Sequence, residues 1–105
     1  MFTSTQNKGF RMDFENKFSI SVQWGLGNYC SNRSSFENGI KENQKDFINS
    51  ISAEVAIFFD NVMLPVTHNE VIGWVSTNDV ARIIAMVSSA NNKKELVKEI
   101  EQKIW

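Results

Sequence analysis

The sequence predicts an α+β fold, in which a four- to five-stranded antiparallel sheet carries C-terminal helices packed on one face. Apolar and polar residues alternate over 10–24 and again over 53–66, which is the period of half-buried strands. Over 80–104 the apolar residues recur instead at intervals of three and four, the spacing of amphipathic helices. A run of strands followed by helices is typical of a sheet that is covered on one side.

Residues 10–24 are expected to form a β-hairpin whose register follows from this alternation. A three-residue loop places Phe14 opposite Phe18 and continues as an apolar row, whereas a two-residue loop would set charge against that row. Such a loop needs a left-handed residue near its end, normally glycine. Here Asn16 or Lys17 must adopt that conformation.

Three more strands are expected further along the chain. The alternation indicates strands over 53–59 and 62–66, joined by a two-residue turn at Asp60–Asn61. Pro65 has no N–H to donate, so the second of these strands must lie at an edge or end there. Residues 71–75 are expected to form a short fifth strand.

Two helices follow, and Ser76 or Thr77 is suited to cap the first, which runs to about Ala90. The second is a terminal amphipathic helix within 92–105. Its repulsive charge pairs weaken it, so it requires a surface to lie on, either the sheet or a partner subunit.

Two segments carry weaker patterns. Residues 1–8 are polar and are expected to form a flexible arm. Residues 31–50 form a polar insertion, in which apolar residues after Asn38–Gly39 are compatible with one short helix.

Composition limits the classes of function. A chain of 105 residues with 42% hydrophobic residues is suited to a single domain with one modest core. Its 11 basic and 12 acidic residues leave no electrostatic signature of nucleic-acid or membrane binding. The single cysteine excludes an internal disulfide, and neither a signal peptide nor a spanning segment is apparent, which predicts a cytoplasmic location.

The loop after the first hairpin is the first candidate site for a ligand or partner. Its aromatic rings can stack on a flat ligand, its polar side chains can hydrogen-bond to it, and its glycine N–H groups can meet an anion. The alternative is that the tryptophan belongs to the core and the glycines only turn the chain. The candidate residues of this loop are Trp24, Gly25, Gly27, Asn28, Tyr29 and Arg33.

Nucleophilic and acid–base sites have less support. Cys30 and His68 are the only cysteine and histidine, and no local motif accompanies them, so a buried structural cysteine is the alternative. Asp13, Glu15 and Glu54 lie at polar strand positions and would form a carboxylate pair only if their strands were neighbours. No metal-ligand spacing occurs, and we expect no cofactor and no catalytic residue.

The polar face of the sheet offers a second candidate surface. Phe58 is the lone aromatic residue among its polar positions, so it either anchors a partner or is covered by residues 31–50. Trp105 and the terminal helix form a further surface, suited to a homo-oligomer.

Three strings of the sequence resemble those of a known group of proteins. They are FENxFxISVQWGxGNYC at 14–30, AEVAI at 53–57 and GWVSxxDVA at 73–81. They resemble small accessory proteins of bacteriophages and related mobile elements, over about Phe10 to Ala90. Lys17 departs from that group, which tends to have glycine there. The resemblance assigns no residue a role, and it implies a class only, namely proteins that bind and block host proteins or sequester nucleotide signals.

The sequence therefore leads to two main hypotheses. The first is a non-enzymatic, phage-type accessory protein that binds and inhibits a host protein, including one of host defence. The second is a protein that binds or sequesters a nucleotide-like ligand with the loop over 24–33. A small hydrolase that uses Cys30 and His68 is the third alternative.

Overall fold

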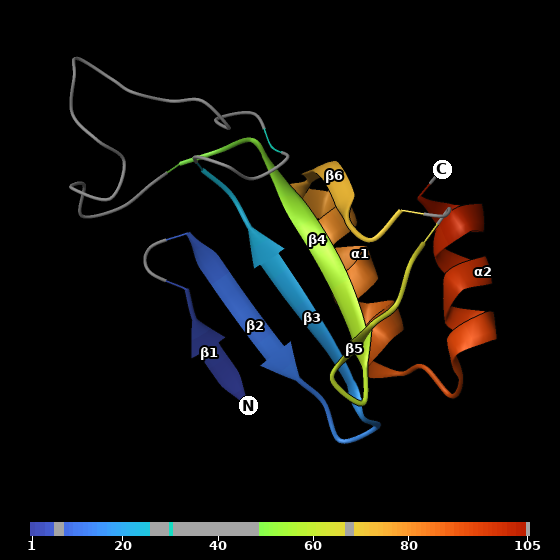
Figure 1. Ribbon diagram of the computed structural model, residues 1–105. Coiled ribbons are helices and arrows are strands. Elements are labelled where there is room, and N and C mark those ends of the chain that lie inside the picture. Colours follow the sequence, from blue (N-terminus) through green and yellow to red (C-terminus); the bar gives the residue numbers. More distant parts are fainter. Residues whose placement is uncertain (6–7, 26–29, 31–48, 67–68, 105) are drawn as a thin grey trace, which may run out of the picture.

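The computed structural model describes residues 1–5, 8–25, 30, 49–66 and 69–104, which form an antiparallel sheet with two helices on one side. The strands are β1 (Phe2–Ser4), β2 (Gly9–Asp13), β3 (Phe18–Gln23), β4 (Ser52–Phe59), β5 (Val62–Met63) and β6 (Ile72–Ser76). The helices are α1 (Thr77–Ser88) and α2 (Lys93–Lys103). The predicted α+β fold with helices on one face is confirmed, with one strand more than expected (Figure 1).

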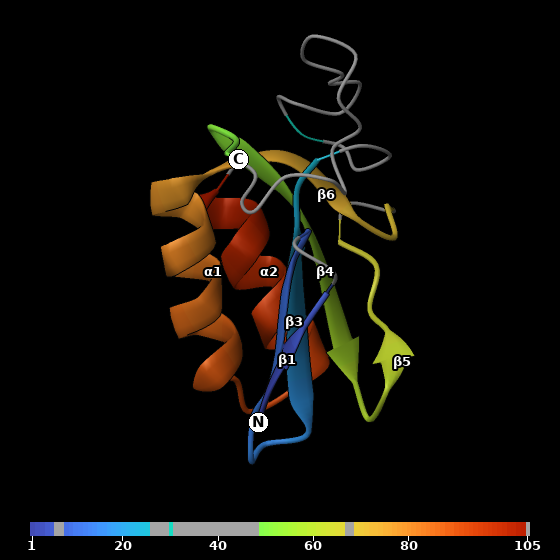
Figure 2. The same cartoon turned by 90° about the vertical axis from the view of Figure 1, so that its left-hand side faces the viewer.

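The strands follow one another as β1-β2-β3-β4, and β4 then pairs with both β5 and β6. β5 pairs with the end of β4 and β6 with its beginning, so the two short strands share one edge. α1 packs against β3, β4 and β6, and α2 packs against α1. Figure 2 shows both helices on one side of the sheet, while the opposite face remains free of them.

The core lies between this sheet and the two helices. Every second residue of β3 and β4 is apolar and packs against the apolar face of α1, which is formed by Ile83, Met86 and Val87. α2 contributes Leu96 and Ile100, which are 2% and 0% exposed, so its apolar side is used inside the chain. The strands contribute Phe18, Ile20, Val22, Ala53, Val55, Ile57, Ile72 and Val75 to this core, and Val66 joins it from the segment between β5 and β6.

Both predicted turns are confirmed. In the first hairpin, Phe10 pairs with Val22 and Met12 with Ile20, and Lys17 has a left-handed φ of 71°. In the second, Phe59 pairs with Val62 across Asp60–Asn61, whose φ values are 52° and 64°. Positive φ at both central residues is the tight turn that matches the twist of a hairpin.

The helix caps also follow the sequence. The Ser76 hydroxyl accepts a hydrogen bond from the Asp79 N–H, as predicted, and the Asn92 side chain accepts one from the Glu95 N–H. The second strand of the later hairpin is shorter than the predicted 62–66, since β5 ends at Met63. Pro65 follows it and cannot continue a ladder.

The expectation of a flexible arm over 1–8 is wrong for Phe2–Ser4, which form the edge strand β1. The ladder extends to the terminus, where the Met1 ammonium donates to the Asp13 carbonyl at 2.9 Å. Three polar or exposed residues show no alternation of their own, so only the tertiary partner β2 makes them a strand. The predicted polar insertion over 31–50 lies outside the described residues, apart from Asn49 and Ser50.

Candidate functional site

A β-bulge at the outer edge of the sheet exposes a tryptophan. Val75 pairs with Ala53 and Ile72 pairs with Val55, so Glu54 alone faces two residues of β6, Gly73 and Trp74. The extra residue shifts the alternation, and Ile72 and Val75 are therefore both buried, although three positions separate them. Trp74 lies between them and is 59% exposed.

The backbone of Trp74 is left-handed, with φ 51°. This conformation is uncommon for a bulky residue and costs on the order of 1–3 kcal/mol. Its indole also leaves a large apolar area in water. A residue such as asparagine would reduce both costs, which makes Trp74 a candidate residue for an interaction surface.

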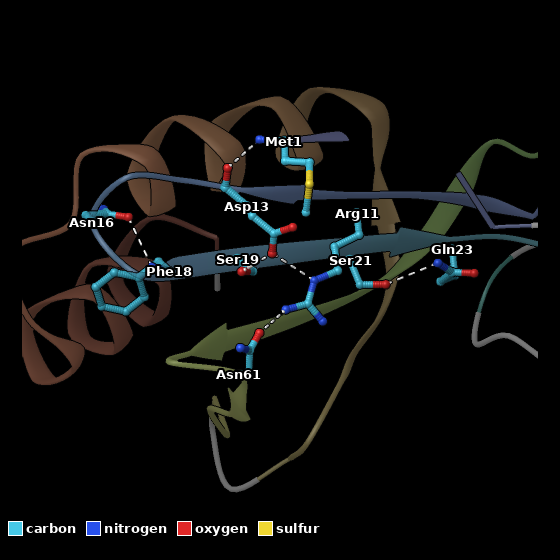
Figure 3. Close-up of polar contacts among 9 residues, drawn as sticks. All are labelled: Met1, Arg11, Asp13, Asn16, Phe18, Ser19, Ser21, Gln23 and Asn61. Carbon is cyan, nitrogen blue, oxygen red and sulfur yellow. Dashed lines mark hydrogen bonds and ion pairs between the residues drawn. The ribbon is translucent and has the colours of Figure 1, made fainter. Parts of the chain in front are cut away.

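The face of the sheet away from the helices carries a polar network centred on Arg11. Its Nε donates to Asp13 Oδ1 at 3.0 Å, and Nη2 donates to Asn61 Oδ1 at 2.9 Å. The guanidinium also lies 4.6 Å from the ring centroid of Phe58. Arg11 thus ties β2 to the β4–β5 turn across the sheet (Figure 3).

Phe58, which the sequence presented as a lone aromatic residue, is half-buried beneath this guanidinium. A partner would have to displace Arg11 from two hydrogen bonds before it could reach the whole ring. The alternative cover by residues 31–50 lies outside the described residues. Phe58 therefore remains a candidate residue, but it is a less accessible anchor than Trp74.

The carboxylate of Asp13, on this face of the sheet, accepts two side-chain hydrogen bonds. The Ser19 hydroxyl donates to Asp13 Oδ1 at 2.6 Å and the Arg11 guanidinium donates to the same oxygen at 3.0 Å. These hydrogen bonds, Ser19 first and Arg11 second, hold the pKa of Asp13 below its ordinary value of 3.8. The ionised form is therefore favoured by folding.

We expect Asp13 to stabilise the fold in a pH-dependent manner. Because its pKa is lower in the folded chain, the stabilisation is fully present above the ordinary value of 3.8 and is lost as the pH falls through the folded pKa. Asp13→Asn should lower the free energy of unfolding at neutral pH, and the difference from the parent should shrink under acid. Urea unfolding at a series of pH values measures this. Ser19→Ala removes the main hydrogen-bond donor to Asp13 and should reduce the pH dependence of the free energy of unfolding. If that pH dependence were unchanged, the role assigned to Ser19 and Asp13 would be contradicted.

The three carboxylates of the acid–base hypothesis do not come together. β3 lies between β2 and β4, and the ladder places Asp13 beside Ser19 while Glu54 pairs with Gln23 at the other end. Glu15 belongs to the exposed turn. A carboxylate pair on neighbouring strands is therefore not formed by these residues.

A hollow lies on the helix-covered side of the sheet, beside the first half of α1. It has a volume of about 470 Å³ and a mainly apolar lining, with a few polar residues at the start of β4 and of α1. Trp24 lines it and packs edge-to-face on Phe10, with ring centroids 6.5 Å apart. Trp24 thus lies at the margin of the core and also faces an open cavity. A role in the core and a role in stacking on a ligand are therefore compatible for this residue. The apolar lining residues are Phe10, Val22, Trp24, Ala53, Val75, Val80, Ala81 and Ile84.

Of the predicted ligand loop, the structure describes Trp24, Gly25 and Cys30. Gly25 is buried with φ 96°, a conformation that favours glycine, and its N–H donates to Cys30 Sγ at 3.1 Å. Cys30 is 2% exposed, which agrees with the structural interpretation of this cysteine. Gly27, Asn28, Tyr29, Arg33 and His68 lie outside the described residues.

Comparison with known proteins adds no assignment: no family model, no curated protein and no solved structure matches the chain. Within the described ranges, no group of three or more His, Cys, Asp and Glu is placed to hold a metal ion. No helix in the described part of the chain has the length and apolar character needed to cross a membrane.

Trp74 is the candidate that sequence reasoning did not single out. Simple alternation over 71–75 puts Trp74 on the same face as Ile72, which would be the core face. The available signal was Gly73, because an isolated glycine within a strand pattern indicates a bulge.

Proposed function

We propose that this chain is a non-enzymatic accessory protein that binds another protein, with the indole of Trp74 as the anchor. The observation that carries the proposal is an exposed, left-handed tryptophan at a β-bulge. Tryptophan is among the residues that contribute most to protein interfaces, and bulges re-aim side chains at functional sites. The resemblance to phage accessory proteins makes a host protein, inhibited by the complex, the expected partner.

Capture from host lysate tests this proposal. Tagged protein is recovered under mild conditions and analysed by native mass spectrometry, as the parent chain and as Trp74→Asn. Asparagine tolerates a left-handed backbone, so the variant removes the indole without changing the conformation of the bulge. We expect the parent to retain a host protein stoichiometrically and Trp74→Asn to retain it at least about 30-fold less strongly, the effect of an interface anchor worth about 2 kcal/mol.

Val62→Asn is the matched control. Val62 is 70% exposed and lies on β5, so the change removes an exposed apolar side chain elsewhere on the same edge. This variant should bind the host protein as the parent does. Equal retention by Trp74→Asn, or no protein retained by the parent, would contradict the proposal.

The second candidate function is the binding of a small, flat, nucleotide-like ligand in the hollow beside α1. It is supported by the volume of about 470 Å³, within the range of small-molecule pockets, and by the aromatic wall of Trp24 and Phe10. Ala81 is exposed on α1 and lines the hollow, so Ala81→Phe should fill it. Native mass spectrometry should then show an added mass of a few hundred daltons on the parent that Ala81→Phe loses and Trp74→Asn keeps.

A further inference from the structure

We propose that two copies of this chain pair through their β1 strands, antiparallel and about a two-fold axis at Thr3, to form one continuous sheet. β1 is the edge strand of the sheet and pairs with β2 alone in the described part of the chain. It lies at the opposite edge from β5 and β6. The proposal does not depend on the proposed function.

Alternate residues of β1 hydrogen-bond to β2, and this determines which backbone N–H and C=O groups of β1 point outward. Met1 exchanges two hydrogen bonds with Asp13, and the Thr5 N–H donates to the Gly9 carbonyl. The odd residues therefore bond to β2, and the N–H and C=O groups of Phe2 and Ser4 point away from it. This outer edge is a template for one more antiparallel strand.

A second copy of β1 fits this edge because the outward pattern is symmetric about Thr3. An axis there pairs Phe2 with Ser4 of the second copy and Ser4 with its Phe2, so each pair exchanges two hydrogen bonds. The two Thr3 side chains meet directly across the axis, where a threonine pair is favourable. No charge or proline in Phe2–Ser4 opposes such pairing.

Apolar exposure at the same edge supports the assignment. Phe2 is 76% exposed, and its register with Met12 puts it on the helix side of the sheet, beyond the reach of α1. In the pair, the Phe2 rings of the two copies become diagonal neighbours, close enough for aromatic side chains to touch. Pairing therefore covers apolar surface that the single chain leaves in water.

Ser4→Pro tests the pairing without disturbing the chain. The Ser4 N–H points away from β2, so proline removes two of the four hydrogen bonds between copies and none between β1 and β2. Sedimentation analysis over about 10 µM to 1 mM should show a dimer of the parent chain, and Ser4→Pro should weaken its association at least about tenfold. Ser4→Ala keeps the N–H and should associate as the parent does.

Thr3→Lys provides an independent variant. Thr3 is exposed and lies opposite Arg11, so lysine should cost the single chain at most about 1 kcal/mol. Across the axis it sets two further like charges directly opposite each other. It should also weaken association, with an unchanged circular dichroism spectrum. A parent chain that stays monomeric over this concentration range would overturn the proposal. The same holds if β1 pairs only with a strand of a different protein. A dimer that neither Ser4→Pro nor Thr3→Lys weakens would also overturn it.

Discussion

Gly9→Ala is expected to lower the free energy of unfolding by about 3 kcal/mol or more. Gly9 opens β2 with φ 151°, and a Cβ built on it would lie 1.9 Å from the Val22 carbonyl oxygen. That atom belongs to the backbone of β3, which is paired with β2 on one side and with β4 on the other. Thermal unfolding should show a midpoint lower by about 10 °C or more, since 1 kcal/mol corresponds to several degrees in a domain of this size.

Lys17→Gly is the matched control for Gly9→Ala, because it removes a side chain at a positive-φ position of the same hairpin, whereas Gly9→Ala adds one. Lys17 is left-handed with φ 71°, which glycine adopts without a steric penalty. The change should leave stability unchanged or raise it by up to about 1 kcal/mol. If Gly9→Ala were as stable as the parent, the close approach of β2 and β3 at this position would be wrong.

Asn16→Asp is expected to lower the free energy of unfolding by about 2–4 kcal/mol, and Asn16→Ala by about 1–3 kcal/mol. The Asn16 amide nitrogen donates to the Val87 carbonyl at 2.9 Å and to the Ala90 carbonyl at 3.1 Å. Its Oδ1 accepts from the Phe18 N–H at 3.1 Å. One side chain thus joins the first hairpin to the C-terminal end of α1.

The aspartate variant is the more damaging of the two because it replaces the donor by a negative charge. That charge would face carbonyl oxygens at the negative end of a helix dipole. Asn78→Asp makes the same exchange in the first turn of α1, where negative charge is favourable, and should be neutral or slightly stabilising. Urea unfolding of the four proteins measures the comparison, and equal effects at the two ends would contradict the proposed role of Asn16.

The hairpins could be predicted because their information is local. Alternation and turn chemistry determine the registers around Lys17 and Asp60–Asn61, and both are confirmed. The strand β1 and the contact from Asn16 to α1 could not be predicted in this way, because each depends on a partner that only folding brings close. Asn16 and Val87, for example, are 71 residues apart in the sequence.

The candidate site was partly predictable for the same reason. Residue type identified Trp24 and Phe58, but the Arg11 guanidinium over Phe58 and the hollow beside Trp24 follow from the sheet order and from the placement of α1. Trp74 was missed because a bulge inserts one residue into the alternation, and only Gly73 indicated it.

The most direct test of the central claim is the fluorescence of Trp74 in the complex. Trp24→Phe combined with Trp105→Phe leaves Trp74 as the only tryptophan of the chain. In the free chain its emission should be that of a largely solvated indole and should be readily quenched by acrylamide, given its 59% exposure. With the host protein bound and its own signal subtracted, the emission should shift to shorter wavelength and become protected from the quencher. A complex in which Trp74 is quenched as in the free chain would contradict the account.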